Sequence, residues 1–291
     1  MNSLAMHEKD NLLLCTDLDQ TLIPNGNAVE SKCARSLFRE LVENIDITLI
    51  YVSGRNISQI YQAIDNYSLP IPAYIIADVG TSIYQSTTTG STQLNSWTDK
   101  IKMDWYEKSP HDISQLIGNL ECLKLQNLDQ QGHFKLSYQV IPTDRMNSDL
   151  IQIKQQLKRH NIQYNCVIST DETIDQGFVD ILPKSANKNL AIEYLINELK
   201  VGHDRVFCCG DSGNDLDMLS RGYPSALVKN SSDAVKQDAI RLCISNNTIE
   251  SLYVAKGSIY KDMNGNYAAG IVEGFLHFFP EYGSSLQLDH N

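Results

Sequence analysis

Two aspartates stand directly behind an apolar run near the start of the chain. Residues 12–16 read LLLCT, and Asp17 and Asp19 follow with one residue between them. Two carboxylates so close together repel each other, and one keeps its proton unless a divalent cation or a division of roles separates them. The spacing therefore predicts a cation site, two acids with different tasks, or both. Mg²⁺ is the cation that best suits oxygen ligands and phosphate together.

A second acidic pair occurs late in the sequence. The run GDSGND places Asp211 and Asp215 in a glycine-bearing loop behind another apolar run, with Asn214 between them. Asp, Ser, Gly and Asn are also common turn formers, so a plain loop is the alternative explanation for this run by itself. Beside the first pair, the run predicts that four acids meet at one edge of a sheet around a cation, because buried unpaired carboxylates would be very costly.

Two further stretches supply groups that favour an anion. The run VSGRN offers the hydroxyl of Ser53, the amide of Gly54 and the charge of Arg55, and Lys188 lies at the expected start of a helix. Amides at a helix N-terminus and a nearby lysine both attract phosphate. Each stretch is weak evidence alone, because Ser-Gly-Arg occurs by chance and a lysine at a helix start is commonly solvated.

A sheet whose strands alternate with helices would position these residues. Apolar runs at 12–16, 47–52, 73–79 and 205–209 are separated by stretches with apolar residues at helical spacing. This alternation predicts an α/β fold with a doubly wound, Rossmann-like parallel sheet. Ligands of such sheets bind beyond the carboxyl ends of the strands, where all the residues above would lie.

The alternation of strands and helices breaks near residue 84. The stretch 82–94 resembles a hairpin with a Thr/Gly turn, and 134–141 alternates between apolar and polar residues, which predicts strands of a different sheet. We therefore expect a discontinuous core formed by residues 1–83 and 184–291. An α+β cap domain would be inserted over residues 84–183.

The ordered set of motifs resembles the haloacid dehalogenase (HAD) phosphatase superfamily. The set comprises D-x-D-x-T, Ser-Gly-Arg, a lysine before a later helix, and G-D-x-x-N-D. Within that superfamily, the runs TDLDQTLI, VSGRN, VGTSIY, VDILPKSANKNLAIEYL and CCGDSGNDLDML are similar to sucrose-phosphate phosphatases and their close relatives. The resemblance covers nearly the whole chain, including a cap between the second and third motifs. It implies a Mg²⁺-dependent phosphatase of a sugar phosphate, with sucrose 6-phosphate as the leading substrate.

The resemblance also implies a role for each motif residue. Asp17 would be the nucleophile that forms an aspartyl phosphate, and Asp19 would protonate the leaving oxygen and later activate water. Mg²⁺ would be held by Asp17, the backbone carbonyl of Asp19 and Asp211, with Asp215 bracing these ligands. The phosphoryl group and the rest of the substrate would be bound by Thr21, Ser53, Gly54, Lys188 and Asn214.

The cap is expected to read the sugar, because a phosphoryl site common to a superfamily does not distinguish sugars. Lys135, Ser137 and Tyr138 match a stretch that contributes to the sugar pocket in the relatives. The alternative is an amphipathic strand with Tyr138 packed inward and the other two side chains in solvent. Residues 171–176 and 255–266 are expected to be additional loops.

Ser53 and Asn189 depart from the family pattern. Sucrose phosphatases often carry threonine at the first position and glycine at the second, so these changes put the sugar preference in doubt more than the chemistry.

Composition excludes several classes of function. The net charge of -11 argues against nucleic acid as a partner. No signal-like segment opens the sequence and no run of about 18 apolar residues occurs, which predicts a cytoplasmic protein without a membrane span. The seven cysteines lack C-x-x-C spacing, so we expect reduced thiols inside the core.

Other functions remain open at this point. The same chemistry could act on mannosyl-3-phosphoglycerate, glucosylglycerol phosphate or trehalose phosphate. A phosphomutase would keep Asp17 as a phosphate carrier. A non-catalytic relative attached to a sugar-phosphate synthase is a further alternative, although the intact set of motif acids and lysine argues against loss of activity. A dinucleotide-binding oxidoreductase is excluded because no G-x-G-x-x-G follows a strand.

Overall fold

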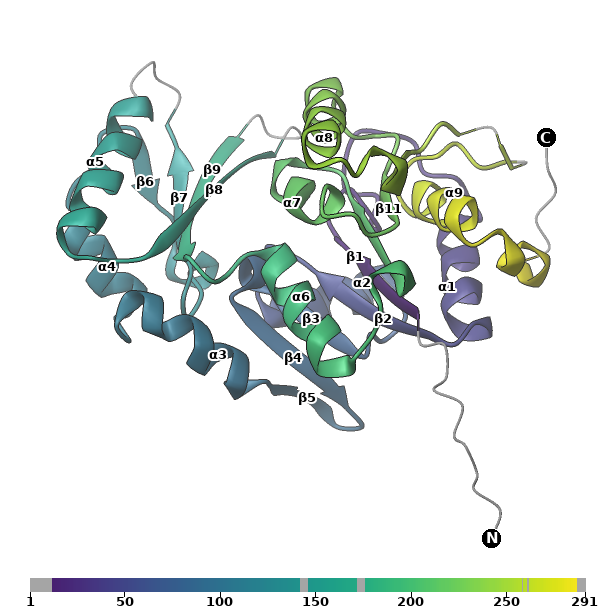
Figure 1. The fold of residues 1–291 in the computed structure, drawn as a ribbon, viewed down its shortest axis with the longest axis horizontal. Helices are drawn as coiled ribbons and strands as arrows, with labels where there is room; N and C mark the ends of the chain where they lie inside the picture. Colours follow the sequence, from purple (N-terminus) through teal and green to yellow (C-terminus); the bar gives the residue numbers. More distant parts are fainter. Residues whose placement is uncertain (1–11, 142–145, 172–175, 258, 261, 287–291) are drawn as a thin grey trace, which may run out of the picture.

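The computed structural model describes residues 12–141, 146–171, 176–257, 259–260 and 262–286 of the 291-residue chain. Helices cover both faces of a large sheet, and a smaller sheet with two helices lies at one end of the molecule, on the left in Figure 1.

Eight strands form the large sheet. They are β1 (Leu12–Thr16), β2 (Ile47–Val52), β3 (Tyr74–Ala77), β4 (Ser82–Thr87), β5 (Gly90–Gln93), β10 (Val206–Gly210), β11 (Ser225–Leu227) and β12 (Leu252–Val254). Their order in space is β12-β11-β10-β1-β2-β3-β4-β5. The six strands from β12 to β3 are parallel, and β4 and β5 are antiparallel additions at one edge. Strands β2 and β3 follow β1 on one side of it, and β10 to β12 lie on its other side. The direction of the strand order therefore reverses between β1 and β10.

Within the described ranges, six α-helices cover the large sheet. They are α1 (Ala34–Asn44), α2 (Ile57–Tyr67), α6 (Lys188–Leu199), α7 (Leu216–Leu219), α8 (Asp233–Asn246) and α9 (Ala268–Phe278). Leu12 and Leu14 of β1 share an apolar core with α1, α2 and α9, and Leu13 and Cys15 share another with α6, α7 and α8. Burial on both faces explains why the strand reads as a continuous apolar run. The doubly wound α/β architecture predicted from the alternation is confirmed.

The smaller sheet is formed by residues inserted between the two halves of the large one. Its antiparallel strands are β6 (Leu123–Leu125), β7 (Leu136–Val140), β9 (Gln176–Pro183) and β8 (Tyr164–Asp171), in that order. The helices α4 (Pro110–Ile117) and α5 (Met146–Arg159) pack on it, and α3 (Asn95–Ile101) leads into this unit. Trp97 and Trp105 are buried.

The hairpin predicted near residue 84 forms, but its assignment to the smaller sheet is wrong. Strand β4 pairs with β3 of the large sheet, so that Tyr84 lies opposite Ile75. An alternating pattern shows that one face of a strand is buried without showing which strand lies beside it. The division into a core and a cap at residues 84 and 183 stays a proposal, and strand pairing places residues 82–93 with the core.

Two helices of the large sheet leave a weak signal in the sequence. Helix α7 is a single turn, and the sequence gives little indication of the longer helix α8, because only Ala239 and Cys243 of α8 are buried and its apolar pattern is weak. Residues 255–266 form no helix or strand where they are described, as expected. Of the loop predicted at 171–176, residues 172–175 lie outside the described residues. Among the described helices, none combines the length and the hydropathy that crossing a bilayer requires.

Candidate active site

The ends of β1 and β10 bring together acids that are far apart in the sequence. The two strands are parallel neighbours, and the N–H of Asp17 donates to the carbonyl of Cys209 at 3.0 Å. Carboxylate oxygens of Asp17, Asp211 and Asp215 all lie within 4.8 Å of one another, and all three residues are buried. Because the strand order reverses here, the acids lie at the position where doubly wound sheets bind their ligands.

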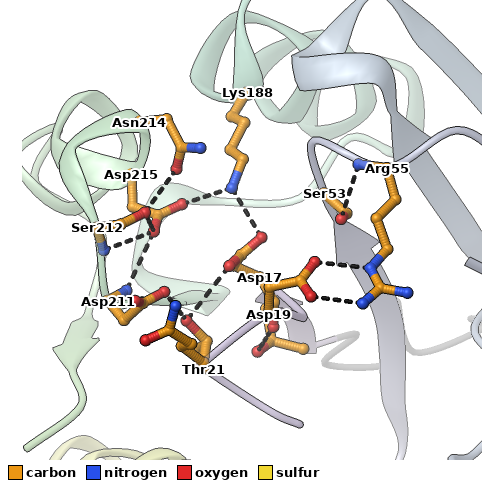
Figure 2. A network of polar contacts seen from close by, with 12 residues as sticks. Asp17, Asp19, Thr21, Ser53, Arg55, Lys188, Asp211, Ser212, Asn214 and Asp215 are labelled. Carbon is orange, nitrogen blue, oxygen red and sulfur yellow. Dashed lines mark hydrogen bonds and ion pairs between the residues drawn. The ribbon is translucent and has the colours of Figure 1, made fainter. Parts of the chain in front are cut away.

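Lys188 joins two of these acids. Its ammonium lies 2.8 Å from Oδ1 of Asp17 and 2.7 Å from Oδ1 of Asp215, and the residue is 2% exposed (Figure 2). It is the first residue of α6, whose N-terminus is capped by the side chain of Asn187 accepting from the N–H of Leu190. The helix start therefore fixes the direction in which the lysine enters the site.

Asp215 is held by more hydrogen bonds than the other acids. Its Oδ2 accepts from the N–H groups of Asp211 and Ser212, both at 3.1 Å, while its Oδ1 accepts from Lys188. It belongs to the short turn η5 (Gly213–Asp215), which Ser212 caps. These bonds occupy the side chain of Asp215, so its geometry suits a bracing role better than that of a direct metal ligand.

Thr21 and Asn214 differ in their contacts and in their exposure. The hydroxyl of Thr21 donates to Oδ1 of Asp211 at 2.8 Å and lies 3.4 Å from Oδ2 of Asp17, and the residue has no exposed surface. Asn214 faces the cleft described below, and its Oδ1 accepts from the hydroxyl of Ser212 at 3.0 Å. Thr21 therefore links two of the acids, and Asn214 is the more accessible of the two predicted binding residues.

The acid cluster carries more negative charge than Lys188 compensates. Burial raises the pKa of Asp17 to about 7, despite the opposing effect of Lys188. Burial and the neighbouring Asp215 raise the pKa of Asp211 well above its ordinary value. Burial by itself would lower the pKa of Lys188, but the two acids beside it raise that pKa. Three close carboxylates with one ammonium fit a hard divalent cation such as Mg²⁺.

Asp19 corrects the expectation that four acids converge. Its carboxylate turns away from the other three and forms two parallel hydrogen bonds with Arg55, from Nε at 2.8 Å and from Nη2 at 2.6 Å (Figure 2). Asn25 donates to the same carboxylate at 2.6 Å. The positive charge of Arg55 was expected to face a bound phosphate, but it is directed at the carboxylate of Asp19. The spacing of residues along the chain does not reveal this pairing.

The predicted anion-binding turn follows β2 at the same edge of the sheet. Gly54 lines the cleft, whereas Ser53 lies beneath it with no exposed surface. The hydroxyl oxygen of Ser53 accepts from the N–H of Arg55 at 3.1 Å. The structure therefore brings the Ser-Gly-Arg turn beside the acids, as Figure 2 shows.

A cleft of about 740 Å³ opens above these residues. The large sheet, its helices and its loops supply Asp17, Asp19, Gly54, Arg55, Gln59, Gln62, Asp211, Asn214, Asn230 and Ser232, among others. The smaller sheet and its loops supply Gln130, Ile168, Ser169, Thr170 and Phe178. Gln59, Gln62 and Asn230 are lining residues that no sequence motif indicated. Asn230 stands just after β11, so the rule of strand ends could have found it, whereas the two glutamines on α2 carry no such signal.

The cap residues singled out in the sequence lie elsewhere. Tyr138 is packed inward and burial raises its pKa to about 12. Lys135 and Ser137 are also buried, so the alternative in which both side chains lie in solvent is wrong. Among the described residues, the cleft lining includes neither Lys135 nor Tyr138. Lys135 instead donates to the carbonyl of Gly54 at 3.0 Å.

Comparison with known proteins identifies the family. A model of the sucrose-6F-phosphate phosphohydrolase family matches residues 10–279. A HAD-like hydrolase of Nitrosococcus oceani is 39% identical over 273 residues, which cover 94% of this chain and 73% of that protein. A glucosylglycerol-phosphate synthase of Pseudomonas anguilliseptica is 30% identical over 92% of this chain, which spans only 31% of the synthase.

A solved structure supports the same fold. The sucrose-phosphatase of Synechocystis, determined with sucrose and phosphate, has a TM-score of 0.74 and 24% identity, and covers 92% of this chain and 98% of its own. At that identity the likeness shows the fold alone, and the family follows from the match over residues 10–279. The chain therefore belongs to the sucrose-6F-phosphate phosphohydrolase family of HAD phosphatases and is a phosphoric monoester hydrolase.

Proposed function

We propose that the protein is a Mg²⁺-dependent phosphatase of a glycosyl phosphate, with sucrose 6-phosphate as the leading substrate. The observation that carries this proposal is the buried group of Asp17, Lys188 and Asp211 beneath a cleft that core and cap share. The cleft suits a sugar, because its amide side chains can bind hydroxyl groups while Ile168 and Phe178 offer apolar contact to the ring.

The proposed reaction has two steps. In the first, an oxygen of Asp17 forms a bond to phosphorus while the bond from phosphorus to the sugar oxygen breaks, and Asp19 gives its proton to that oxygen. In the second, Asp19 takes a proton from water, whose oxygen attacks phosphorus and releases Asp17 and free phosphate. Lys188 and the Ser53–Gly54 turn hold the phosphoryl oxygens in both steps.

Mg²⁺ would be held by Asp17, Asp211 and the backbone carbonyl of Asp19, with Asp215 as a brace. When bound, it would neutralise part of the charge that builds on the phosphoryl oxygens. The excess of buried negative charge described above supports this assignment.

Glucosylglycerol phosphate is a second candidate substrate. The synthase of Pseudomonas anguilliseptica matches 92% of this chain at 30% identity, and its printed name refers to that compound. The same match supports association with a sugar-phosphate synthase as a proposal, because a region similar to this chain lies within the longer synthase.

Release of inorganic phosphate from a panel of esters tests the proposal. The panel contains sucrose 6-phosphate, glucosylglycerol phosphate, trehalose phosphate and mannosyl-3-phosphoglycerate, each assayed with Mg²⁺ and with a chelator. We expect kcat/KM for sucrose 6-phosphate to exceed that of the others by at least about 10-fold. Comparable turnover of all four esters would overturn the assignment of sucrose 6-phosphate as the preferred substrate. Release of phosphate from none of them would overturn the proposed phosphatase activity on glycosyl phosphates. Isomerised sugar phosphate without free phosphate would indicate a mutase.

A further inference from the structure

Lys135 is a cap residue whose side chain is buried against the core. It is 6% exposed, and its ammonium donates to the carbonyl of Gly54 at 3.0 Å. The same ammonium lies 3.6 Å from Oδ1 of Asp78, and Asp180 of β9 also interacts with its charge. A Cβ on Gly132, three residues before the lysine, would lie 3.1 Å from the carboxylate of Asp78. The turn before β7 is therefore packed closely on this part of the core, and two acids compensate the burial of a positive charge.

The turn that Lys135 contacts has most of its peptide groups paired. The carbonyl of Ser53 accepts from the N–H of Val79 at 3.0 Å, and the carbonyl of Arg55 accepts from the N–H of Asp78 at 2.9 Å. Within the part of the chain that the structure describes, the N–H of Gly54 has no partner, although Gly54 lines the cleft. This N–H is available to donate to a phosphoryl oxygen.

Lys135 and Ser53 bind opposite ends of one peptide unit. The carbonyl of Gly54 accepts from Lys135, and the N–H of Arg55 in the same peptide donates to the hydroxyl oxygen of Ser53 at 3.1 Å. Because a peptide unit is planar and trans, fixing its carbonyl fixes the direction of its N–H. Hydrogen bonds in such a series also strengthen one another. The oxygen of Ser53 accepts, so its own O–H remains available as a donor.

We propose that Lys135 is a positioning residue for the phosphoryl group. From the cap it fixes the Gly54–Arg55 peptide, whose N–H donates to the Ser53 hydroxyl oxygen and so directs the Ser53 O–H towards the phosphoryl group. The Gly54 N–H belongs to the preceding peptide, whose carbonyl is held by Val79. The cap would then complete the phosphate site in addition to lining the sugar side of the cleft. This inference rests on the proposed function, because it assigns the phosphoryl group to the Ser53–Gly54 turn.

A double-mutant cycle tests this role. The variants are Lys135→Met, Ser53→Ala and the double variant, assayed with an ester that the wild type hydrolyses and with orthovanadate as an inhibitor that resembles the phosphoryl group in transfer. We expect Lys135→Met to lower kcat/KM and to raise the vanadate inhibition constant by a similar factor of about 10 to 100. In the Ser53→Ala background the same change should cost much less, because the peptide no longer directs a hydroxyl.

Controls separate positioning from folding. Lys124→Met removes an exposed lysine of β6 in the same sheet, and its activity should match the wild type. Lys135→Arg keeps the charge beside Asp78 but moves the donor, so it replaces Lys135→Met in the cycle if thermal unfolding shows that the methionine variant is not folded. Strictly additive losses, or unchanged vanadate inhibition, would overturn the role of Lys135. A wild type that hydrolyses no ester of the panel would overturn the proposed function instead.

Discussion

The ammonium of Lys188 lies 2.8 Å from Oδ1 of Asp17, beneath the cleft. Both side chains are almost completely removed from solvent, so each offsets part of the cost of burying the other. The ammonium is also 2.7 Å from Oδ1 of Asp215, and this second contact restrains its position relative to Asp17. The ion pair therefore fixes an oxygen of the proposed nucleophile at a defined point above the end of β1.

Replacement of Lys188 is expected to impair both folding and activity. Lys188→Met should lower kcat/KM about 10³-fold, because a fixed positive charge beside the phosphoryl group is lost. Breaking a buried pair by removing one partner should also lower the free energy of unfolding by about 3 to 5 kcal/mol. Steady-state kinetics and denaturant unfolding measure the two effects. Lys184→Met, which removes an exposed lysine just before α6, is the control, and near-normal activity of the Lys188 variant would contradict the assignment.

Asp17→Asn is expected to abolish turnover and to change the pH dependence of stability. Burial raises the pKa of Asp17 to about 7, so the folded protein keeps a proton that the unfolded chain loses near pH 4. The folded state then binds more protons than the unfolded state between these values, and the free energy of unfolding falls as pH rises from about 4 to 7. When a chelator removes metal ions, Asp17→Asn should lack this pH-dependent part of the free energy of unfolding.

Urea unfolding of wild type and Asp17→Asn at several pH values measures the difference. Near pH 7.5 the variant should be more stable by an amount on the order of 2 to 4 kcal/mol, and near pH 4 the two should agree. A constant difference across the range would show that Asp17 ionises as it does in the unfolded chain. Any turnover close to the wild-type rate would remove Asp17 as the nucleophile.

The sequence predicts those site residues whose position depends on the backbone alone. Asp17 and Asp211 directly follow adjacent parallel strands, so the rule of strand ends places them together. The direction of the Asp19 carboxylate depends on a guanidinium from another strand end, and no local pattern encodes that pairing. The burial of Lys135 is likewise not predictable from the sequence, because it depends on the contact between the turn at Gly132 and Asp78.

The elements that the sequence misplaces have weak or ambiguous patterns. Strand β4 alternates as a strand of either sheet could, and only its pairing with β3 shows to which sheet it belongs. Helix α8 buries few residues, which leaves little periodicity to read. Prediction was strong where burial on both faces produced continuous apolar runs, as in β1 and β10.

Gly80 is expected to be essential for the placement of Lys188. It lies in η1 (Asp78–Gly80) with φ of +97°, and a Cβ there would overlap the backbone of Asn187 and Lys188. Gly80→Ala should therefore lower both the unfolding temperature and kcat. Gly90→Ala is the matched control, because Gly90 also has a positive φ but no atom within 4 Å of its added Cβ. The control should lose about 1 kcal/mol of stability and no activity, and equal effects of the two changes would show that the contact with α6 is unimportant.

Mg²⁺ is expected to stabilise the folded protein, because a ligand that binds only the native state raises its stability. The unfolding temperature should rise by several degrees as Mg²⁺ is increased from chelator to about 100 times its dissociation constant, which corresponds to about 2.7 kcal/mol. Asp211→Asn should remove most of this increase, since it takes away one of three clustered carboxylates. Asp204→Asn, at an exposed position, should retain it. An identical response of all three proteins would place the cation elsewhere.

Arg55 is expected to act through Asp19 rather than on the phosphoryl group, because its guanidinium is occupied by two hydrogen bonds to that carboxylate. A sugar is a poor leaving group and needs a proton from Asp19, whereas p-nitrophenolate leaves without one. Arg55→Met should therefore slow phosphorylation of the enzyme by a sugar phosphate about 10- to 100-fold, and by p-nitrophenyl phosphate much less. Rapid-quench measurement of the first turnover compares the two esters, with Asp19→Asn as the reference for complete loss of the acid. Equal losses with both esters would mean that Arg55 contacts the phosphoryl group itself.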